Sequence, residues 1–218
     1  IWLFVDDNII FDHSAAKELF KALIPLRINW VSQADISVTR DPELMDIMIK
    51  SGCIGLLIGF ESIDPQSIKS MNKSINLIGF DHYAEALKIL RSNGLLIWGT
   101  FTFGHDNDTV DSIKNTLDFA IENKLLMADF NVLVPFPNTP LYNELKNQNR
   151  LLYDGKWWLH PDYRFGKATF VPKNMSPDEL ESACFNAYRK FFSFTSILKR
   201  LFDRKAHMKN FKNMFLFA

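Results

Sequence analysis

The sequence predicts an α/β fold, a partial (β/α) barrel of about five parallel strands followed by an α-helical C-terminal extension. Three observations lead to this prediction. Short apolar runs alternate with amphipathic stretches, each strand–helix unit spans about 25 to 35 residues, and the strand expected at 54–60 is nearly all apolar, as in a sheet covered on both faces. Hydrophobic residues make up 47% and charged residues 23% of the 218 residues, as in a folded globular protein.

The expected elements follow one another as five strand–helix units. Asp41-Pro42 is a typical helix start, and Gly52 a typical stop. Asn93-Gly94 marks a second helix end, and Asp108 or Thr109 a further helix start. We expect strands over 2–5, 28–31, 54–60, 95–103 and 130–134, and helices over 13–23, 42–50, 80–92, 109–123 and 139–146.

The pattern changes after Arg150, so residues 1–150 are predicted to form the partial barrel and residues 151–218 the extension. An irregular segment and a short strand at 170–172 come first. Ser176, Pro177 and Glu179 then form a helix start with a capping box, and that helix should run to Phe192. A second helix should begin at Ser196.

Polar or backbone-exposing residues follow the expected strands. Ligands meet the carboxyl ends of the strands in parallel α/β folds, so this rim is the predicted site. The rim segments are Asp6-Asp7-Asn8, residues 32–35, Glu61-Ser62, residues 104–106 and residues 135–137.

The residues alone leave several roles open. Asp6 and Asp7 could bind a metal or a ligand amine, but helix capping is slightly favoured. Glu61 ends an apolar strand, where a carboxylate needs a polar partner, so a functional role is favoured. Gly99 and Gly104 allow close backbone approach to a ligand, whereas core packing alone would explain Phe101 and Phe103.

Composition and charge narrow the classes of partner. Lys and Arg balance Asp and Glu at net charge zero, which argues against nucleic acid. The two cysteines predict no disulfide framework and fit a cytoplasmic protein, and no run reaches the length of a membrane span. The basic tail over 189–212 could contact an anionic membrane surface, but a docked helix with a solvated basic face is favoured.

Five blocks in order resemble the radical SAM enzymes, most closely the group with an N-terminal cobalamin-binding domain. The blocks are FVDDN, DPELMDIMIKSGC, LLIGFESID, GTFTFGHDNDT and VLVPFPNTPLY, and residues 169–200 resemble that group's C-terminal region. The resemblance implies a partial barrel in which a reduced [4Fe–4S] cluster cleaves S-adenosylmethionine (SAM) to a 5′-deoxyadenosyl radical. The predicted strands then correspond to the second to sixth of the family.

The resemblance also implies roles for the rim residues. Asp6 and Asp7 would lie beside the SAM amino group, and Glu61 and Ser62 near the ribose and methionyl part. The segment Gly99–Gly104, with Phe101 and Phe103, would line the adenine. Val134 and Pro135 would offer backbone groups to it.

The chain departs from the family in its cysteines. The family binds its cluster through CxxxCxxC after the first strand, and neither Cys53 nor Cys184 belongs to such a pattern. No cobalamin-binding domain is found either, and Asn138 stands where the family often has Gly, a mild change because Asn tolerates the same backbone region.

We therefore expect the C-terminal part of a radical SAM enzyme, inactive by itself, with a small or lipid-like acceptor substrate. The parent would transfer a methyl group, with cobalamin as a further cofactor, or rearrange its substrate. Strand 2–5 would present an open edge that invites self-association. Two alternatives are a non-catalytic scaffold and an unrelated barrel enzyme that holds a divalent metal with Asp6, Asp7 and Glu61.

Overall fold

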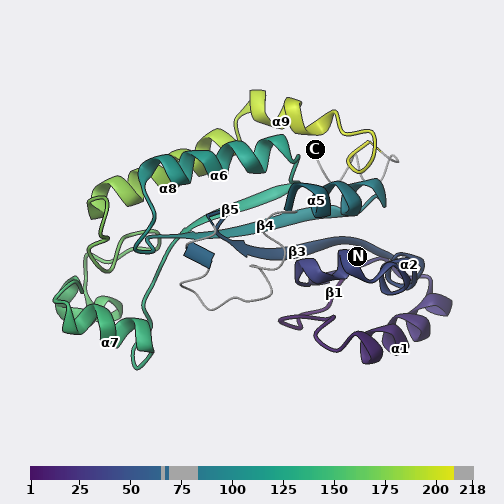
Figure 1. Cartoon of the computed structure of the whole chain (residues 1–218), viewed down its shortest axis with the longest axis horizontal. Coiled ribbons are helices and arrows are strands. Elements are labelled where there is room, and N and C mark those ends of the chain that lie inside the picture. Colours follow the sequence, from purple (N-terminus) through teal and green to yellow (C-terminus); the bar gives the residue numbers. More distant parts are fainter. Residues whose placement is uncertain (65–66, 69–82, 209–218) are drawn as a thin grey trace.

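A computed structural model describes residues 1–64, 67–68 and 83–208, and its centre is a five-stranded sheet in the order β1-β2-β3-β4-β5. All neighbouring strands are parallel. The strands form a half-barrel with the helices on one side (Figure 1). The predicted partial (β/α) barrel is thus confirmed. The strands are β1 (Trp2–Leu3), β2 (Trp30–Gln33), β3 (Cys53–Glu61), β4 (Leu96–Phe103) and β5 (Met127–Val132).

Three helices begin at the capping residues that the sequence indicated, whereas the helix expected from Ser196 begins at Phe194, after the cap Ser193. Asp41 accepts a bond from Leu44 N, and Thr109 and Ser176 each form a capping box. Asp12 caps the first helix. The α-helices of the barrel part are α1 (His13–Leu23), α2 (Pro42–Lys50), α5 (Tyr83–Ser92), α6 (Val110–Glu122) and α7 (Pro140–Asn147), and short 3₁₀ turns cover Ile24–Leu26 and Ile36–Arg40.

The strand predictions differ from the structure in their bounds, and the strand expected at 2–5 is Trp2–Leu3. The strand expected at 28–31 is Trp30–Gln33, and the one expected at 130–134 is Met127–Val132. The segment at 170–172 is a single antiparallel bridge between Leu151 and Phe170. Apolar residues continue beyond the hydrogen-bonded part of each strand, so sequence patterns place strand ends poorly. Residues 80–82 of the expected third helix lie outside the described residues.

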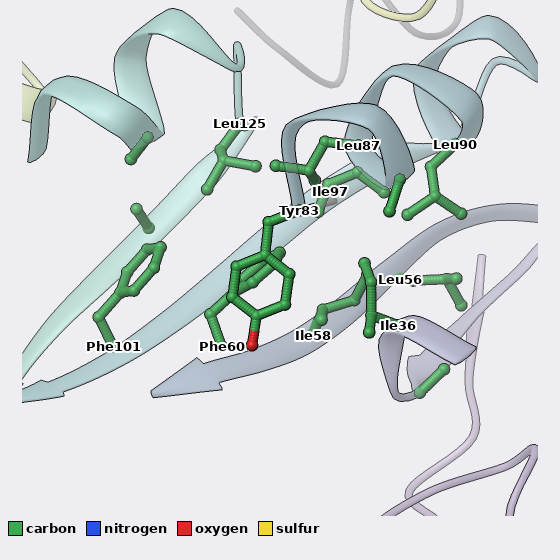
Figure 2. Packing of buried hydrophobic residues seen from close by; sticks show 14 of the residues in the cluster. Ile36, Leu56, Ile58, Phe60, Tyr83, Leu87, Leu90, Ile97, Phe101 and Leu125 are labelled. Carbon is green, nitrogen blue, oxygen red and sulfur yellow. The ribbon is translucent and has the colours of Figure 1, made fainter. Parts of the chain in front are cut away.

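One face of the sheet is a hydrophobic core against the helices. Phe60, Phe101 and Phe130 stack across β3, β4 and β5, with ring centroids 5.5 Å and 5.8 Å apart. Tyr83 meets Phe60 edge to face at 5.1 Å, and Figure 2 shows it between Phe60 and the leucines of α5. Burying these large rings supplies much of the stability of the sheet.

The extension packs against the last unit of the barrel. Helix α8 (Pro177–Phe191) lies beside α6 and against β5, and α9 (Phe194–Leu201) follows it (Figure 1). Phe191 and Phe130 have ring centroids 5.9 Å apart. The boundary predicted at residue 150 stays a prediction.

The buried side chain of Arg200 anchors the C-terminal end of α9 to the rest of the protein. Its guanidinium is buried, donates to the carbonyl oxygens of Leu125, Leu126 and Phe191, and lies 3.7 Å from the ring centroid of Phe191. The expected solvated basic face is therefore wrong at Arg200, because this cation serves as a hydrogen-bond donor to buried carbonyls. Within the described part of the chain, no helix is both long enough and apolar enough to cross a bilayer.

Candidate functional site

The other face of the sheet is polar, and we call it the inner face. Its polar side chains are those of Glu61, Trp98, Thr100, Thr102, Asp129 and Asn131, and Gly59 lies among them. Along β4 the residues Ile97, Gly99, Phe101 and Phe103 are buried, and the residues between them are half-buried. Because side chains alternate across a strand, these half-buried residues share one face.

The register of the strands brings the inner-face residues into rows. Thr100 pairs with Gly59 on one side and with Asp129 on the other, and Thr102 pairs with Asn131. The indole Nε1 of Trp98 donates to Asp129 Oδ2 at 2.7 Å. The inner face is therefore a preorganised set of donors and acceptors around Glu61, unlike the ring-filled face behind it.

Glu61 stands at the carboxyl end of β3 in an unusual backbone conformation. Its φ is +63°, and Ser62 N donates to Phe60 O across it at 2.8 Å. The pairing with β4 is irregular between Gly59 and Glu61, as at a β-bulge. Positive φ at a non-glycine residue is uncommon and clusters at functional sites, so the local strain marks Glu61.

The Glu61 carboxylate is held over the inner face. Thr102 Oγ1 donates to its Oε2 at 3.0 Å. A Cβ added to Gly59 would lie 2.8 Å from Oε1, so only glycine at position 59 leaves the carboxylate its place. Tyr83 lies on the core side of the same strand end, and its pKa is raised by burial and secondly by the Glu61 charge. Tyr83 therefore keeps its proton near neutral pH.

Asp6 and Asp7 lie at the same edge of the sheet as Glu61, because β1 and β3 run parallel. Both are exposed, and neither caps α1, which uses Asp12. The capping interpretation of the sequence is therefore wrong. Asn8, next to them, donates to Asp35 Oδ2 at 2.7 Å and so links the ends of β1 and β2.

Ser62 and Gly104 have structural contacts at the rim. The buried Ser62 hydroxyl accepts from Asp64 N at 3.0 Å. Gly104 has φ +115°, and a Cβ there would lie 2.9 Å from the Phe170 ring, so glycine allows the extension to pack on the end of β4. Their predicted contacts with SAM stay predictions.

The buried Asp108 carboxylate ties two rim loops together. Its Oδ2 accepts from the backbone N of Gly104 and of His105, both at 2.9 Å, and Oδ1 accepts from Ser67 Oγ at 3.2 Å. Burial raises the pKa of Asp108, against the opposing effect of His105 and of these hydrogen bonds. Asp108 thus shapes the rim without facing the inner face.

The structure places Phe101 and Phe103 in the core rather than on the inner face. Phe101 is 0% exposed and lies between Phe60 and Phe130. Gly99 shares their face, and a Cβ there would lie 2.7 Å from Leu125 Cδ1. Their predicted role at the adenine stays a prediction, and Thr100 and Thr102 are the β4 side chains that face the site.

Val134 and Pro135 follow β5 at the same rim. Val134 is half-buried and Pro135 buried, and Trp157 Nε1 lies 3.5 Å from the Pro135 carbonyl oxygen. The predicted contact of these two residues with adenine stays a prediction.

Neither cysteine fits an iron–sulfur cluster. Cys53 and Cys184 are both buried, and burial raises the pKa of each thiol to about 12. Across residues 1–64, 67–68 and 83–208, no three His, Cys, Asp or Glu side chains form a group that could hold a metal ion. Asp6, Asp7 and Glu61 therefore do not form the divalent-metal site that the alternative barrel enzyme would need.

Sequence reasoning did not single out Gly59, Trp98, Thr100, Thr102, Asp129 or Asn131. The signal was present in the alternation of WGTFTF, in which Trp98, Thr100 and Thr102 share a face opposite to the aromatic residues. The same alternation in DFN separates Asp129 and Asn131 from Phe130.

Sequence comparisons find relatives along most of the chain. The bacteriochlorophyllide d C-12(1)-methyltransferase of Chlorobaculum tepidum is 31% identical over 198 residues, which cover 91% of this chain and 42% of the relative. The hopanoid C-2 methylase of Rhodopseudomonas palustris is 26% identical over 69% of this chain and 29% of the relative. The chain spans less than half the length of these relatives. No protein-family model matches it.

A solved structure shares the fold. The radical S-adenosylmethionine methyltransferase TsrM from Kitasatospora setae, with cobalamin and a [4Fe–4S] cluster bound, superposes with a TM-score of 0.59 at 19% identity. The match covers 88% of this chain and 35% of TsrM. The chain thus shares its fold with about a third of TsrM.

Sequence and fold agree on the class of protein. The chain is related to radical SAM-type methyltransferases and cyclases, which confirms the resemblance of its five blocks. Within that class, its relatives include enzymes named for methylation of bacteriochlorophyllides and hopanoids.

Proposed function

We propose that this chain is the SAM-facing wall of a radical SAM methyltransferase whose cluster ligands lie outside these 218 residues. The observation that carries the proposal is the Glu61 carboxylate, strained at φ +63°, bonded to Thr102 and dependent on Gly59 for space. SAM would supply the group that is transferred or the radical that starts the reaction. By itself the chain would not turn over substrate.

The chain's own residues would bind and orient the adenosine part of SAM. Glu61 offers a carboxylate oxygen to the ribose hydroxyls, because a carboxylate is a strong acceptor for such donors. Thr102 holds that carboxylate in place. Asn131 and Thr100, in neighbouring rows of the inner face, are placed to meet the base, and Asp6 and Asp7 lie at the same edge for the amino group.

The relatives support a methyl acceptor that is large and mostly apolar. Two of them are named for methylation of a bacteriochlorophyllide and of a hopanoid. TsrM was solved with cobalamin, so cobalamin is proposed as a further cofactor of the whole enzyme. The non-catalytic scaffold remains the alternative if the inner face does not bind SAM.

Saturation-transfer NMR with SAM tests this proposal, because it detects weak binding. We expect transfer from the protein to the adenine protons of SAM, and loss of that transfer in Glu61→Gln. Glu18→Gln on the exposed surface of α1 is the matched control and should retain it. Absence of transfer in the wild-type chain, or equal transfer in Glu61→Gln, would contradict the proposal.

Reconstitution with iron and sulfide tests the placement of the cluster ligands. We expect no stoichiometric cluster absorbance, because both thiols are buried and their pKa values are raised to about 12. A stoichiometric [4Fe–4S] spectrum from this chain would show that the assignment of the ligands to another segment is wrong.

A further inference from the structure

A cavity lies along the free side of β5, next to the inner face. Its volume is about 900 Å³, within the range of small-molecule pockets. Strand β5 is the last in the sheet order, so helix α8 and the loop 163–167 lie beside it instead of another strand. We call this cavity the β5 groove.

Aromatic rings form the walls of the β5 groove. Phe185 and Tyr188 belong to α8, and Tyr163 and Phe165 to the facing loop. Phe165 is 93% exposed, Phe185 62% and Tyr188 50%. Rings from opposite walls offer flat apolar surface at low conformational cost, which suits a flat apolar ligand.

The loop is fastened to α8, so the groove is preformed. Glu181 accepts from Lys167 Nζ at 2.6 Å and from Ala168 N at 2.9 Å. Trp157 supports Tyr163, with ring centroids 4.8 Å apart. A preformed groove loses little ordering entropy when a ligand binds.

Two cations, Arg164 and Lys167, and two carboxylates, Asp129 and Glu181, line the groove. Glu181 pairs with Lys167, whereas Asp129 accepts a hydrogen bond from the neutral Trp98 indole and keeps its charge. Arg164 is exposed and donates to the carbonyl oxygens of Pro161 and Tyr163, and no described carboxylate pairs with it. Its guanidinium can meet an anionic group of a ligand whose apolar body lies between the rings.

The groove is continuous with the inner face. Asp129 and Asn131 line it, and so does Val134 at the rim. A ligand in the groove would therefore reach the edge of the surface proposed to hold SAM.

We infer that the β5 groove binds the acceptor substrate, and that this substrate is a flat, mostly apolar molecule with a carboxylate or similar anion. The identification of the ligand as the acceptor substrate rests on the proposed function, whereas binding of such a ligand in the groove does not. Phe165, Phe185 and Tyr188 contact the apolar body, and Arg164 contacts the anion.

Titration of the full chain with two porphyrin probes tests the inference. Protoporphyrin IX carries two carboxylates, and its dimethyl ester has the same ring without the charges. We expect saturable binding of both, seen as a change in porphyrin absorbance. Phe185→Ser should weaken both probes about tenfold, since loss of a stacked ring is worth at least 1.4 kcal/mol. Arg164→Gln should weaken only the dicarboxylate, by about two- to fivefold.

The control is Phe194→Ser, which removes a phenylalanine that is 73% exposed at the start of α9 and outside the groove. It should leave both affinities unchanged, and circular dichroism should show that every variant is folded. The inference is overturned if neither probe saturates, if Phe194→Ser weakens binding as much as Phe185→Ser, or if Arg164→Gln affects both probes equally.

The porphyrin titration contains no SAM, so its result is independent of the saturation-transfer experiment that measures SAM binding. The two experiments together separate the two proposals. SAM binding at the inner face without porphyrin binding would refute the groove alone. Porphyrin binding with the expected variant effects, but without SAM contact, would retain the groove as a site for an apolar anion and refute the proposed function.

Discussion

The two faces of the same sheet differ in what fills them. Behind β4, Phe101 lies fully buried between two stacked rings, whereas in front of it Thr100 and Thr102 are half-buried beside Glu61. Alternate residues of β4 thus contribute to the core and to the candidate site. Changes of similar size on the two faces should therefore have different consequences.

Truncation of a core ring should have the largest effect. Phe101→Ala removes a fully buried ring and leaves a cavity, so the free energy of unfolding should fall by about 3–5 kcal/mol. Thr100→Ala, one residue away on the inner face, should lower it by less than about 1 kcal/mol. Urea denaturation followed by circular dichroism measures both, and similar losses would break the distinction between the faces.

Two glycines provide a comparison with the same added methyl group. In Gly99→Ala the new Cβ meets Leu125 Cδ1 at 2.7 Å and the Phe60 ring at 3.2 Å, so we expect a loss of about 1–3 kcal/mol. In Gly59→Ala the first obstacle is Glu61 Oε1 at 2.8 Å, the end of a flexible side chain. Stability should change by less than about 1 kcal/mol, but SAM contact should be lost.

Urea denaturation and saturation transfer measure the two glycine variants together. A Gly59→Ala protein that keeps full transfer to the adenine protons would show that the position of Glu61 does not matter for SAM. Unchanged stability in Gly99→Ala would show that the core side of β4 can accommodate an added methyl group.

The buried thiol of Cys53, at the start of β3, should make the free energy of unfolding depend on pH. Burial raises the pKa of Cys53 from 9.0 to about 12, so above pH 9 the unfolded chain releases a proton that the folded chain keeps. The folded state then binds more protons, and stability falls with rising pH, by up to about 1.4 kcal/mol per pH unit. Below pH 9 this contribution is fully present.

Cys53→Ala removes that titration. Between pH 8 and pH 10 the wild-type free energy of unfolding should fall by about 1 kcal/mol more than that of the variant. All other groups are the same in both proteins, so the difference isolates Cys53. Equal slopes would mean that the thiol is accessible to water.

The sequence predicted the layers of the fold better than the site. The alternation of strands and helices predicted the parallel sheet, and the capping residues Asp41, Thr109 and Ser176 predicted helix starts. Both signals are local in the sequence. The site depends on which strand neighbours which and on register. The pairing of Thr102 with Asn131, and the bond from Thr102 to Glu61 across 41 residues, have no local signal.

The aromatic residues illustrate the same limit. The resemblance to radical SAM enzymes placed Phe101 and Phe103 at the adenine, although core packing alone would explain them from the residues. The structure puts them on the core side, since Gly99 accommodates Leu125 and Phe60, and Gly104 accommodates Phe170. Only the three-dimensional arrangement separates a glycine that admits a ligand from one that admits a neighbouring side chain.

The smallest change in stability and the sharpest test of the inner face come from one hydroxyl group. Thr102→Val keeps the shape of the side chain and removes the donor to Glu61 Oε2, so the free energy of unfolding should change by less than about 1 kcal/mol. Loss of that bond removes one of the interactions that position the carboxylate, and saturation transfer to SAM should fall several-fold. Thr116→Val in α6, which removes a hydroxyl that donates to Ser112 O away from the inner face, is the matched control and should retain the transfer. If both variants retain it, Glu61 needs no support from β4, and the preorganisation attributed to the inner face is wrong.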